Sequence, residues 1–270
     1  MTPAAFLRAS REAGARVRQA IRPLVGTAEG GRELSVGAGG DRTVELDRRA
    51  EEITIGVLQS LAAEARFSLL SEEAGGRRFG AGYPRLLLDP VDGSLNAKRG
   101  IQLFGFMTAL VEGARVGDAV AGYISNLVTG EEWHALRGEG AFVDGRRFHT
   151  PAPARVDRFE VLGLESGARS VLRAAPLLER AAKVRIPGSM ALAIVYAAAG
   201  RFDVFCAPFP ARVFDMTAGL LIASEAGASV SDLGGRSPGR LPADLEARTD
   251  LLVTGGPAQH EWALAAMRGA

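Results

Sequence analysis

Two aspartates that directly follow an apolar segment are the most informative residues in the chain. They lie in the stretch Leu86-Leu87-Leu88-Asp89-Pro90-Val91-Asp92-Gly93-Ser94. Asp-Pro fixes a turn at a strand end and Gly93 permits a tight backbone, so both carboxylates and the Val91 carbonyl can converge on one point. The Gly93 and Ser94 N–H groups could then face a phosphate oxygen. Taken alone, the stretch fits a surface turn equally well.

Acidic residues recur at comparable positions elsewhere in the chain. Glu72 follows an apolar segment at 67–70, and Asp47 and Asp215 each open a helical pattern. Individually, these acids are better explained by solvated turns or by the preference of helix starts for negative charge. Strand carboxyl ends and helix starts, however, face a common crevice in α/β sheets. We therefore expect one shared acidic cluster, made of Glu72, Asp89, Asp92 and Asp215.

Such an acidic cluster would need cations. Two carboxylates about 4 Å apart repel each other by roughly 1 kcal/mol in water and by roughly 4 kcal/mol at a partly buried site. Hard oxygen ligands without cysteine or histidine point to Mg²⁺, with Mn²⁺ as a substitute. Paired ions about 4 Å apart suit in-line displacement at phosphorus. The pattern of acids therefore indicates metal-assisted chemistry on a phosphate group.

Helices and strands in the first half must position these acids. An apolar face at helical spacing predicts a first helix and consists of Phe6, Ala13, Val17, Ile21 and Leu24. A Gly-rich stretch at 35–40 follows, which we expect to be mobile, and a second helix begins at about residue 47. Strands are expected at 67–70, 86–88, 104–110 and 119–124 and around Trp133 and Phe142. With a hairpin turn at Asp144-Gly145, the later strands form an antiparallel meander.

The second half alternates strands and helices. Strands are expected at 159–164, 183–186, 202–206, 228–231 and 251–254, and helices at 168–182, 189–199 and 214–226, with a final helix around Trp262. The apolar helix at 189–199 should be buried. A Pro/Ala-rich segment at 151–154 resembles a joint, so we expect an N-terminal half, 1–150, carrying the metal motifs and a C-terminal half, 151–270, completing the site. The pattern favours mixed α/β layers.

Bulk composition is that of a globular protein with a sizeable core. Of the 270 residues, 47% are hydrophobic and 23% charged, and the net charge of +1 disfavours binding to nucleic acid or to an anionic membrane. The single cysteine, Cys206, excludes an intrachain disulfide and reads as a buried strand residue, which fits a reducing compartment. Arginines interrupt the first helical pattern, so it is no signal peptide, and no apolar run is long enough to span a membrane. We expect a cytoplasmic protein.

Two segments resemble the signatures of the inositol monophosphatase family. Residues 89–96, Asp-Pro-Val-Asp-Gly-Ser-Leu-Asn, are similar to its metal-binding signature, and residues 214–219, Phe-Asp-Met-Thr-Ala-Gly, are similar to its second signature. The segment 188–203 and the motif Ser71-Glu72-Glu73 also resemble family segments. The similarity extends over residues 6–265, and the two signatures together are much more specific than either alone.

The resemblance implies a fold, an activity and roles for individual residues. It implies a layered α-β-α-β-α sandwich, usually a homodimer, that acts as a Mg²⁺-dependent phosphatase on a small phosphate ester. About two or three ions per site would be held by Glu72, Asp89, Asp92, Asp215 and the Val91 carbonyl. Asp47 and Ser94 would orient and deprotonate the attacking water, and Thr43 belongs to the same catalytic set. The residues expected to bind substrate are Asp92, Gly93, Ser94, Arg185, Gly188, Ser189, Met190 and Arg212.

Several positions depart from the family pattern. The loop 36–43 lacks the lysine of animal-type members and is closer to the archaeal branch, which often accepts both inositol phosphates and fructose 1,6-bisphosphate. The inositol-binding glutamate expected seven residues before Asp215 is Pro208. Arg212 is similar to an arginine of the archaeal-type enzymes and could pair with a second phosphate or a sugar oxygen, although a surface arginine at a helix start is an equal alternative. Residues 73–83 are short and Gly-rich, which predicts an open pocket wall.

Alternative functions remain open at this point. Inositol 1-phosphate and fructose 1,6-bisphosphate are the leading substrates, and 3′-phosphoadenosine 5′-phosphate and histidinol phosphate are alternatives within the same class. A non-catalytic binding protein on the same fold would need a lost ligand, yet every metal and base position is filled. A calcium-stabilised carbohydrate-binding protein would also use acidic clusters, but it does not explain Asp47 and Ser94.

Overall fold

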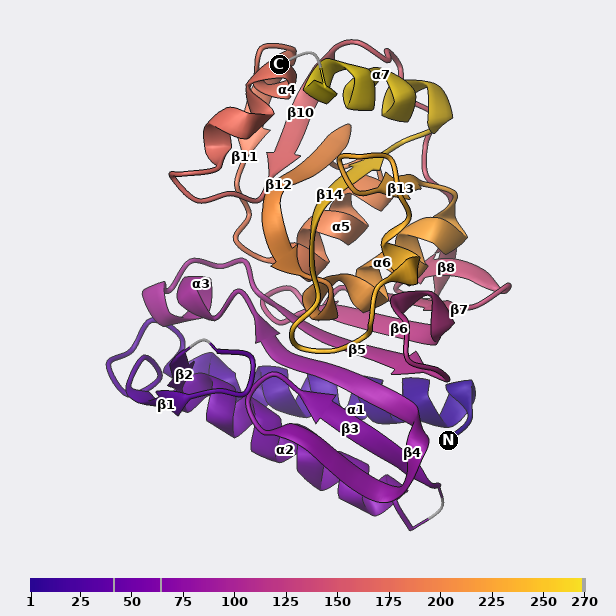
Figure 1. The fold of residues 1–270 in the computed structure, drawn as a ribbon. Coiled ribbons are helices and arrows are strands. Elements are labelled where there is room, and N and C mark those ends of the chain that lie inside the picture. Colours follow the sequence, from indigo (N-terminus) through magenta and orange to yellow (C-terminus); the bar gives the residue numbers. More distant parts are fainter. Residues whose placement is uncertain (41, 64, 269–270) are drawn as a thin grey trace.

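The computed structural model describes residues 1–40, 42–63 and 65–268, and its elements stack in five layers (Figure 1). Two helices cover a seven-stranded sheet, two more helices lie between this sheet and a five-stranded sheet, and a last helical layer covers the outer face of the second sheet. This is the layered α-β-α-β-α sandwich that the sequence predicts. Asp41, in the expected mobile loop, lies outside the described residues.

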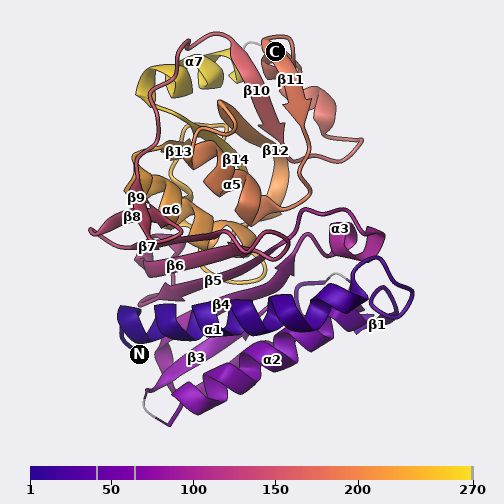
Figure 2. The ribbon, with the colours of Figure 1, turned by 180° about the vertical axis from the view of Figure 1, so that it is seen from behind.

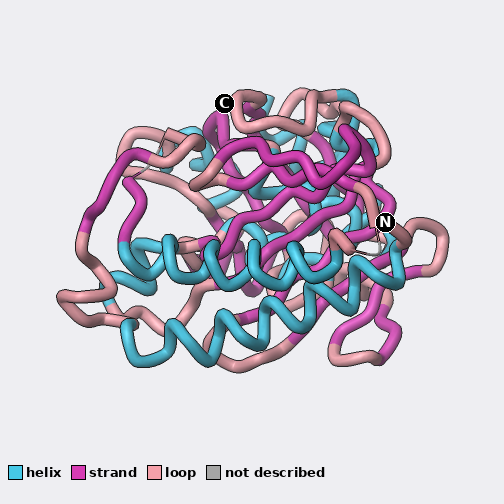
Figure 3. Tube along the Cα trace, turned by 90° about the horizontal axis from the view of Figure 1, so that it is seen from below, coloured by secondary structure: helices cyan, strands magenta, loops and turns pink. Residues whose placement is uncertain are grey.

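The first layer consists of two antiparallel amphipathic helices. Helix α1 spans Pro3–Ile21 and α2 spans Glu45–Leu61, and both lie side by side across one face of the larger sheet (Figures 2 and 3). Thr2 caps α1 by accepting a hydrogen bond from Ala5 N–H, and Pro3 supplies a preset φ at the helix start. The apolar face predicted for this helix is buried, as expected. A two-stranded hairpin joins the helices and comprises β1 (Glu33–Val36) and β2 (Arg42–Val44).

The seven-stranded sheet has the order β3-β4-β5-β6-β7-β8-β9. Its strands are β3 (Phe67–Ser71), β4 (Gly75–Asp92), β5 (Gly105–Val111), β6 (Ala119–Asn126), β7 (Glu132–Leu136), β8 (Gly140–Val143) and β9 (Arg146–Phe148). From β4 to β9 the strands form the predicted antiparallel meander, with the turn at Asp144-Gly145. Strand β3 runs parallel to the 85–88 part of β4, so both strands end at the same edge of the sheet.

Strand β4 is longer than the sequence suggests. Its first part, beginning at Gly75, also pairs with β3, and the chain then turns back towards Arg85. Residues 75–83 thus extend along β3 and line neither cavity at the site, and an open pocket wall stays a prediction. Helix α3 (Ser94–Arg99) follows β4 directly, after Gly93 adopts a left-handed conformation with φ of 94°.

The middle layer is almost entirely apolar. It contains α5 (Met190–Ala198) and α6 (Thr217–Ala226), the latter preceded by the 3₁₀ turn η4 (Phe214–Met216). Helix α6 packs on β6, β7 and β8, and α5 packs on β12 and β14 of the second sheet. One hydrophobic core therefore joins residues of both predicted halves, including Met107, Trp133, Ile194 and Phe205.

The five-stranded sheet has the order β11-β10-β12-β14-β13. Its strands are β10 (Phe159–Leu164), β11 (Ala181–Arg185), β12 (Val204–Arg212), β13 (Ser229–Ser231) and β14 (Arg248–Thr254). Cys206 lies in β12 and is fully buried, as predicted, and burial raises the pKa of its thiol to about 12. Short 3₁₀ turns occur at η1 (Arg22–Leu24), η2 (Val116–Asp118), η3 (Val171–Ala174) and η5 (Pro238–Arg240).

The outer layer contains α7 (Pro257–Arg268) and the very short α4 (Ala175–Leu178). The sequence predicts one helix over 168–182, and this is wrong. Pro176 lacks an N–H and would break a helix running through it, so it stands instead in the first turn of α4, and residues from Ala181 join β11. In the part of the chain that the structure describes, no helix combines the length and hydropathy needed to cross a bilayer.

Candidate active site

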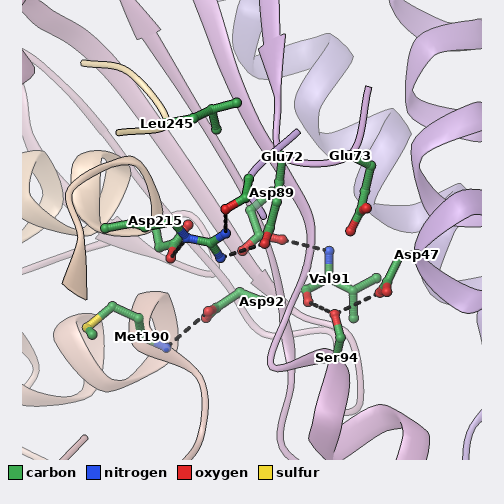
Figure 4. A network of polar contacts seen from close by, with 12 residues as sticks. Asp47, Glu72, Glu73, Asp89, Val91, Asp92, Ser94, Met190, Asp215 and Leu245 are labelled. Atoms are coloured by element: carbon green, nitrogen blue, oxygen red, sulfur yellow. Dashed lines mark hydrogen bonds and ion pairs between the residues drawn. The ribbon is translucent and has the colours of Figure 1, made fainter. Parts of the chain in front are cut away.

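Three acidic side chains meet where two strand ends and a helix start come together. Glu72 directly follows β3, Asp89 belongs to the end of β4, and Asp215 lies in η4. One carboxylate oxygen from each residue lies within 4.8 Å of the others (Figure 4). The parallel pairing of β3 with β4 causes this, because Glu72 N–H donates to Leu88 O at 3.2 Å and so holds the two strand ends in register.

Burial gives this acidic cluster unusual electrostatics. Burial, followed by repulsion from Glu72 and Asp92, raises the pKa of Asp89 well above its ordinary value. Burial also raises the pKa of Asp215 to about 7, although Arg212 opposes the shift. Three carboxylates at this spacing repel one another unless protons or cations compensate them.

The donors in the cluster fit a hard divalent cation. Asp215 Oδ1 is buried and has no hydrogen-bond partner among the described residues, so its lone pairs are available to a cation. The ligand atoms are all carboxylate oxygens, the donors that Mg²⁺, Ca²⁺ and Mn²⁺ prefer. The positions and the ligand chemistry of these three acids therefore fit a site for a divalent cation.

Arg212 supplies a positive charge inside the same cluster. Its Nη2 lies 2.5 Å from Glu72 Oε1, and its Nε donates to Asp215 Oδ2 at 2.9 Å. Its Nη1 also donates to Gly39 O at 3.4 Å. The guanidinium group thus bridges two of the three clustered acids and the Gly-rich loop.

Asp92 lies next to the cluster but faces helix α5. Its Oδ1 accepts a hydrogen bond from Met190 N–H at 3.1 Å, and its Oδ2 accepts one from Ala191 N–H at 2.8 Å and another from the Ser189 hydroxyl. Burial raises its pKa to about 6, although these hydrogen bonds lower it. Of the four acids predicted to cluster, Glu72, Asp89 and Asp215 therefore lie closest together, and Asp92 holds the start of α5.

Asp47 and Ser94 are in direct contact, as the sequence predicts. Ser94 Oγ lies 2.7 Å from Asp47 Oδ1 and 2.8 Å from Val91 O, while Asp47 Oδ2 accepts a hydrogen bond from Val44 N–H at 3.1 Å. Figure 4 shows this group on the side of Val91 away from Asp215. Burial raises the pKa of Asp47 to about 6. A carboxylate held this way can accept a proton through a hydroxyl group.

Comparison with known proteins identifies the family. The model of the inositol monophosphatase family matches residues 2–270. The chain belongs to this family. It is 32% identical to the fructose-1,6-bisphosphatase/inositol-1-monophosphatase of Methanothermobacter thermautotrophicus over 257 residues, covering 91% of this chain and 90% of that protein. It is 34% identical to the inositol-1-monophosphatase of Mesorhizobium japonicum over 209 residues, covering 75% and 76%.

Solved structures agree with the family in fold. A Pyrococcus horikoshii protein described as similar to inositol-1 monophosphatase superimposes with a TM-score of 0.82 at 22% identity, covering 98% of this chain and 99% of that one. The inositol monophosphatase family consists of metal-dependent phosphatases, and this chain is accordingly a phosphoric monoester hydrolase.

The Gly-rich loop of this family member packs onto the acidic cluster. Ala38 N–H donates to Glu73 O at 3.0 Å and Gly39 N–H to Glu72 O at 2.7 Å. A Cβ at Gly39 would lie 2.6 Å from Arg212 Nη1 and 2.9 Å from Glu72 Cγ, so a larger residue there would displace one of these two side chains. Mobility of the loop stays a prediction.

Glu73 is a site residue that sequence reasoning did not single out. It accepts a hydrogen bond from the Thr43 hydroxyl, and burial raises its pKa to about 7. Glu73 lines the cavity that contains Asp47 and Ser94, and Thr43 reaches this wall through its hydrogen bond to Glu73. Its position next to Glu72 in the Glu-Glu motif is the signal that could have identified it.

Most of the predicted substrate residues surround the site, but Arg185 does not. Gly93 lies against the start of α5, where a Cβ would come within 2.8 Å of Gly188 O. Arg185, at the end of the edge strand β11, is exposed and donates to Val184 O at 2.9 Å. It contributes to neither cavity at the acidic cluster, because Pro187 and Gly188 turn the chain between it and the site.

Two further residues of this inositol monophosphatase homologue hold the substrate side of the site. Asn96 is buried, and its Nδ2 donates to Leu103 O and to Pro187 O, both at 2.7 Å. Glu165 follows β10, and its Oε2 accepts a hydrogen bond from Gly188 N–H at 3.0 Å. Asn96 falls inside the first signature, whereas no motif marks Glu165.

Proposed function

We propose that the chain hydrolyses a small sugar or cyclitol phosphate, with inositol 1-phosphate and fructose 1,6-bisphosphate as the leading substrates. The observation that carries the proposal is the cluster of Glu72, Asp89 and Asp215, with the Asp47–Ser94 pair beside it. Relatives that cover most of the chain are named for these two activities.

Mg²⁺ is the cofactor we propose, at about two or three ions per site, with Mn²⁺ as a substitute. The proposed ligands are Glu72, Asp89, Asp92, Asp215 and the Val91 carbonyl. When bound, the ions supply Lewis acidity and neutralise charge on the phosphate group. Asp92 would contribute while its hydrogen bonds to Met190 and Ala191 fix its orientation.

The chain's own residues would then orient the reactants. Asp47 would draw a proton from the attacking water through Ser94, and its pKa of about 6 suits a base working near neutral pH. Thr43 and Glu73, which share a hydrogen bond, would fix the wall next to that water. The Gly93 and Ser94 N–H groups would hold phosphate oxygens.

Arg212 is the residue we propose for a second phosphate or a sugar oxygen. It lines both cavities at the cluster, and its planar group already pairs with Glu72 and Asp215. Cations bound by these two acids would weaken those ion pairs and make the guanidinium available to substrate. Gly188, Ser189 and Met190 would form the adjacent wall.

We further propose that the protein acts as a cytoplasmic homodimer whose partners are small phosphate esters and not nucleic acids or membranes. The near-neutral net charge of +1 supports the last point, because no strong field would attract polyanions. A single buried thiol supports a reducing compartment.

A panel of phosphate-release assays with Mg²⁺ tests the function. The panel contains inositol 1-phosphate, fructose 1,6-bisphosphate, 3′-phosphoadenosine 5′-phosphate, histidinol phosphate and p-nitrophenyl phosphate. We expect Asp47→Asn to lower kcat by roughly 10²–10⁴-fold, the range for loss of a general base. Asp89→Asn should in addition weaken the dependence on Mg²⁺ concentration.

The matched control is Asp157→Asn, because Asp157 lies outside the site and forms a surface ion pair with Arg155 at 3.4 Å. This variant should hydrolyse every ester at the unchanged rate. Phosphate release that is equally fast in Asp47→Asn and Asp157→Asn would remove Asp47 from the mechanism. Absence of hydrolysis of all five esters would contradict the proposed function.

A further inference from the structure

Two cavities meet at the acidic cluster. One, of about 370 Å³, contains the Asp47–Ser94 pair, and the other, of about 420 Å³, is lined by Glu165, among others. Asp92 and Arg212 line both cavities, so the two cavities adjoin there, and the Gly93 and Ser94 N–H groups proposed to hold the phosphate follow Asp92 directly in the first cavity. We call the second one the leaving-group cavity, defined by Glu165, Gly188, Met190, Phe209, Arg212 and Arg248.

The in-line geometry of phosphoryl transfer implies that one cavity holds the attacking water and the other holds the alcohol part of the ester. In phosphoryl transfer the attacking and leaving oxygens lie roughly opposite each other across phosphorus. The Asp47–Ser94 pair places the attacking water in the first cavity. The alcohol part of the ester must then extend to the other side, which is the leaving-group cavity.

Glu165 is held firmly in the wall of the leaving-group cavity. Its backbone N–H donates to Cys206 O at 3.0 Å, which ties it to the neighbouring strand β12. Its side chain is half-buried, and Oε2 accepts the hydrogen bond from Gly188 N–H at 3.0 Å. Backbone and side chain are therefore both fixed, so little conformational entropy is lost when the carboxyl group binds a ligand.

We infer that Glu165 is a specificity-determining residue that hydrogen-bonds a hydroxyl group of the substrate's alcohol part. The inference rests on the proposed function and names the group on the substrate that this wall recognises. A carboxyl group with one oxygen bound to Gly188 keeps acceptor capacity for a ligand. The neighbouring strand β12 provides no such acceptor at the matching position, because Pro208, at the end of the buried part of β12, has no polar side-chain atom.

Charge favours a hydroxyl over a second phosphate at this wall. Glu165 and Asp92 both line this cavity, and burial, followed by repulsion from Asp92, raises the pKa of the Glu165 carboxyl group to about 7. This wall therefore disfavours a further negative charge, whereas a carboxyl group in either protonation state can hydrogen-bond a hydroxyl group. The positive side chains, Arg212 and Arg248, belong to neighbouring positions on β12 and β14 that pair in the sheet. A second phosphate would therefore lie against the arginines, and hydroxyl groups against Glu165.

Glu165 could alternatively serve only to hold Gly188 in place, and kinetics on two esters separate these roles. One ester is the polyhydroxylated compound of the panel that the unchanged enzyme cleaves best, expected to be inositol 1-phosphate. The other is p-nitrophenyl phosphate, whose leaving group carries no hydroxyl. For Glu165→Ala we expect KM for the polyhydroxylated ester to rise about 10–100-fold, whereas kcat/KM for p-nitrophenyl phosphate stays within about twofold.

Two further variants make the comparison specific. Glu165→Gln keeps an oxygen for Gly188 N–H and should show a smaller selective loss, about 3–10-fold. Glu160→Ala removes an exposed carboxylate from the same strand and should change neither ester's kinetics. With the unchanged enzyme, a deoxy ester that lacks the recognised hydroxyl should bind more weakly than the parent ester. With Glu165→Ala, the two esters should bind equally well.

Three outcomes would overturn the inference. Equal losses on both esters in Glu165→Ala and Glu165→Gln would show that Glu165 only supports the loop at Gly188. Unchanged KM for the polyhydroxylated ester in both folded variants would show that no substrate hydroxyl meets it. If the unchanged enzyme cleaves no ester at all, the proposed function itself fails, and this inference fails with it.

Discussion

Individual carboxyl groups in this site are protonated more readily than carboxyl groups in water. The clearest cases are Asp47, with a pKa of about 6, and Asp215, with a pKa of about 7, and burial is the largest cause in both. In an unfolded chain both groups would titrate near the ordinary value of about 3.9. Folding without cations therefore favours their protonated forms.

This difference predicts that the metal-free protein loses stability as the pH rises. Because the folded-state pKa values are raised, the stabilising contribution is complete below about pH 4 and disappears as the pH passes through 6 and 7. In EDTA, we expect Tm to fall by roughly 5–10 °C between pH 5.5 and pH 8, as thermal unfolding will measure. Saturating Mg²⁺ should flatten the trend, because bound cations replace the protons.

Asp47→Asn provides the control for the pH effect, since an amide does not titrate and part of the slope should vanish. A Tm in EDTA that climbs over the same pH interval would contradict the explanation.

The sequence predicts site residues well when each one stands next to a strand end or a helix start. Glu72, Asp89 and Asp215 satisfy this rule, and the structure brings them together. The sequence does not predict which groups a carboxylate will face in the folded protein. Asp92 binds the start of α5, which lies about a hundred residues away in sequence, and Glu165 reaches the site only because β10 lies next to β12.

At the scale of elements, the substrate side depends on a clamp between α3 and the segment before α5. Asn96, in α3, donates two hydrogen bonds from Nδ2, to Leu103 O and to Pro187 O. Gly188 packs against this amide, because a Cβ there would lie 2.8 Å from Asn96 Nδ2. One side chain therefore positions the wall that contains Gly188, Ser189 and Met190.

Asn96→Ala should loosen that wall. One buried and one partly buried carbonyl group would lose their donor, and we expect a loss of about 1–3 kcal/mol of unfolding free energy together with a higher KM. Urea denaturation and steady-state kinetics measure the two effects. Gln102→Ala, which removes an exposed hydrogen bond to Gly100 O, should leave both quantities nearly unchanged. Equal behaviour of the two variants would exclude the clamp.

Element types followed from periodicity wherever packing and local chemistry agree. Helix α1 has its predicted apolar face against the sheet, and the strands and the turn expected between residues 104 and 145 became the meander from β5 to β9. The helix expected at 168–182 fails because apolar residues there have helical spacing but Pro176 interrupts the hydrogen-bond ladder. The early part of β4 was missed because glycines and arginines hide a strand that backbone pairing with β3 stabilises.

At the scale of the whole molecule, the two halves share one core. Helices α5 and α6 belong to the second half by sequence, yet α6 packs on the sheet of the first half. Residues 1–150 alone would expose the apolar face of the seven-stranded sheet to water. We therefore expect the halves to unfold together.

The two tryptophans allow this expectation to be tested, because Trp133 lies in β7 and Trp262 in α7. Trp262→Phe leaves a reporter in the first half, and Trp133→Phe leaves one in the second. Within each variant, the urea midpoint from fluorescence should coincide with that from far-UV circular dichroism. Separate midpoints in either variant would indicate two independently folding units.

Arg212 bears on whether the chain folds before or after it binds metal. During folding, Glu72, Asp89 and Asp215 come together in the interior of the protein. The guanidinium group of Arg212, in β12, comes to the same place and provides a positive charge that partly compensates them. The chain can thus complete its tertiary structure before it meets a divalent ion. Acquisition of the ion then becomes a late, separate and reversible step of maturation.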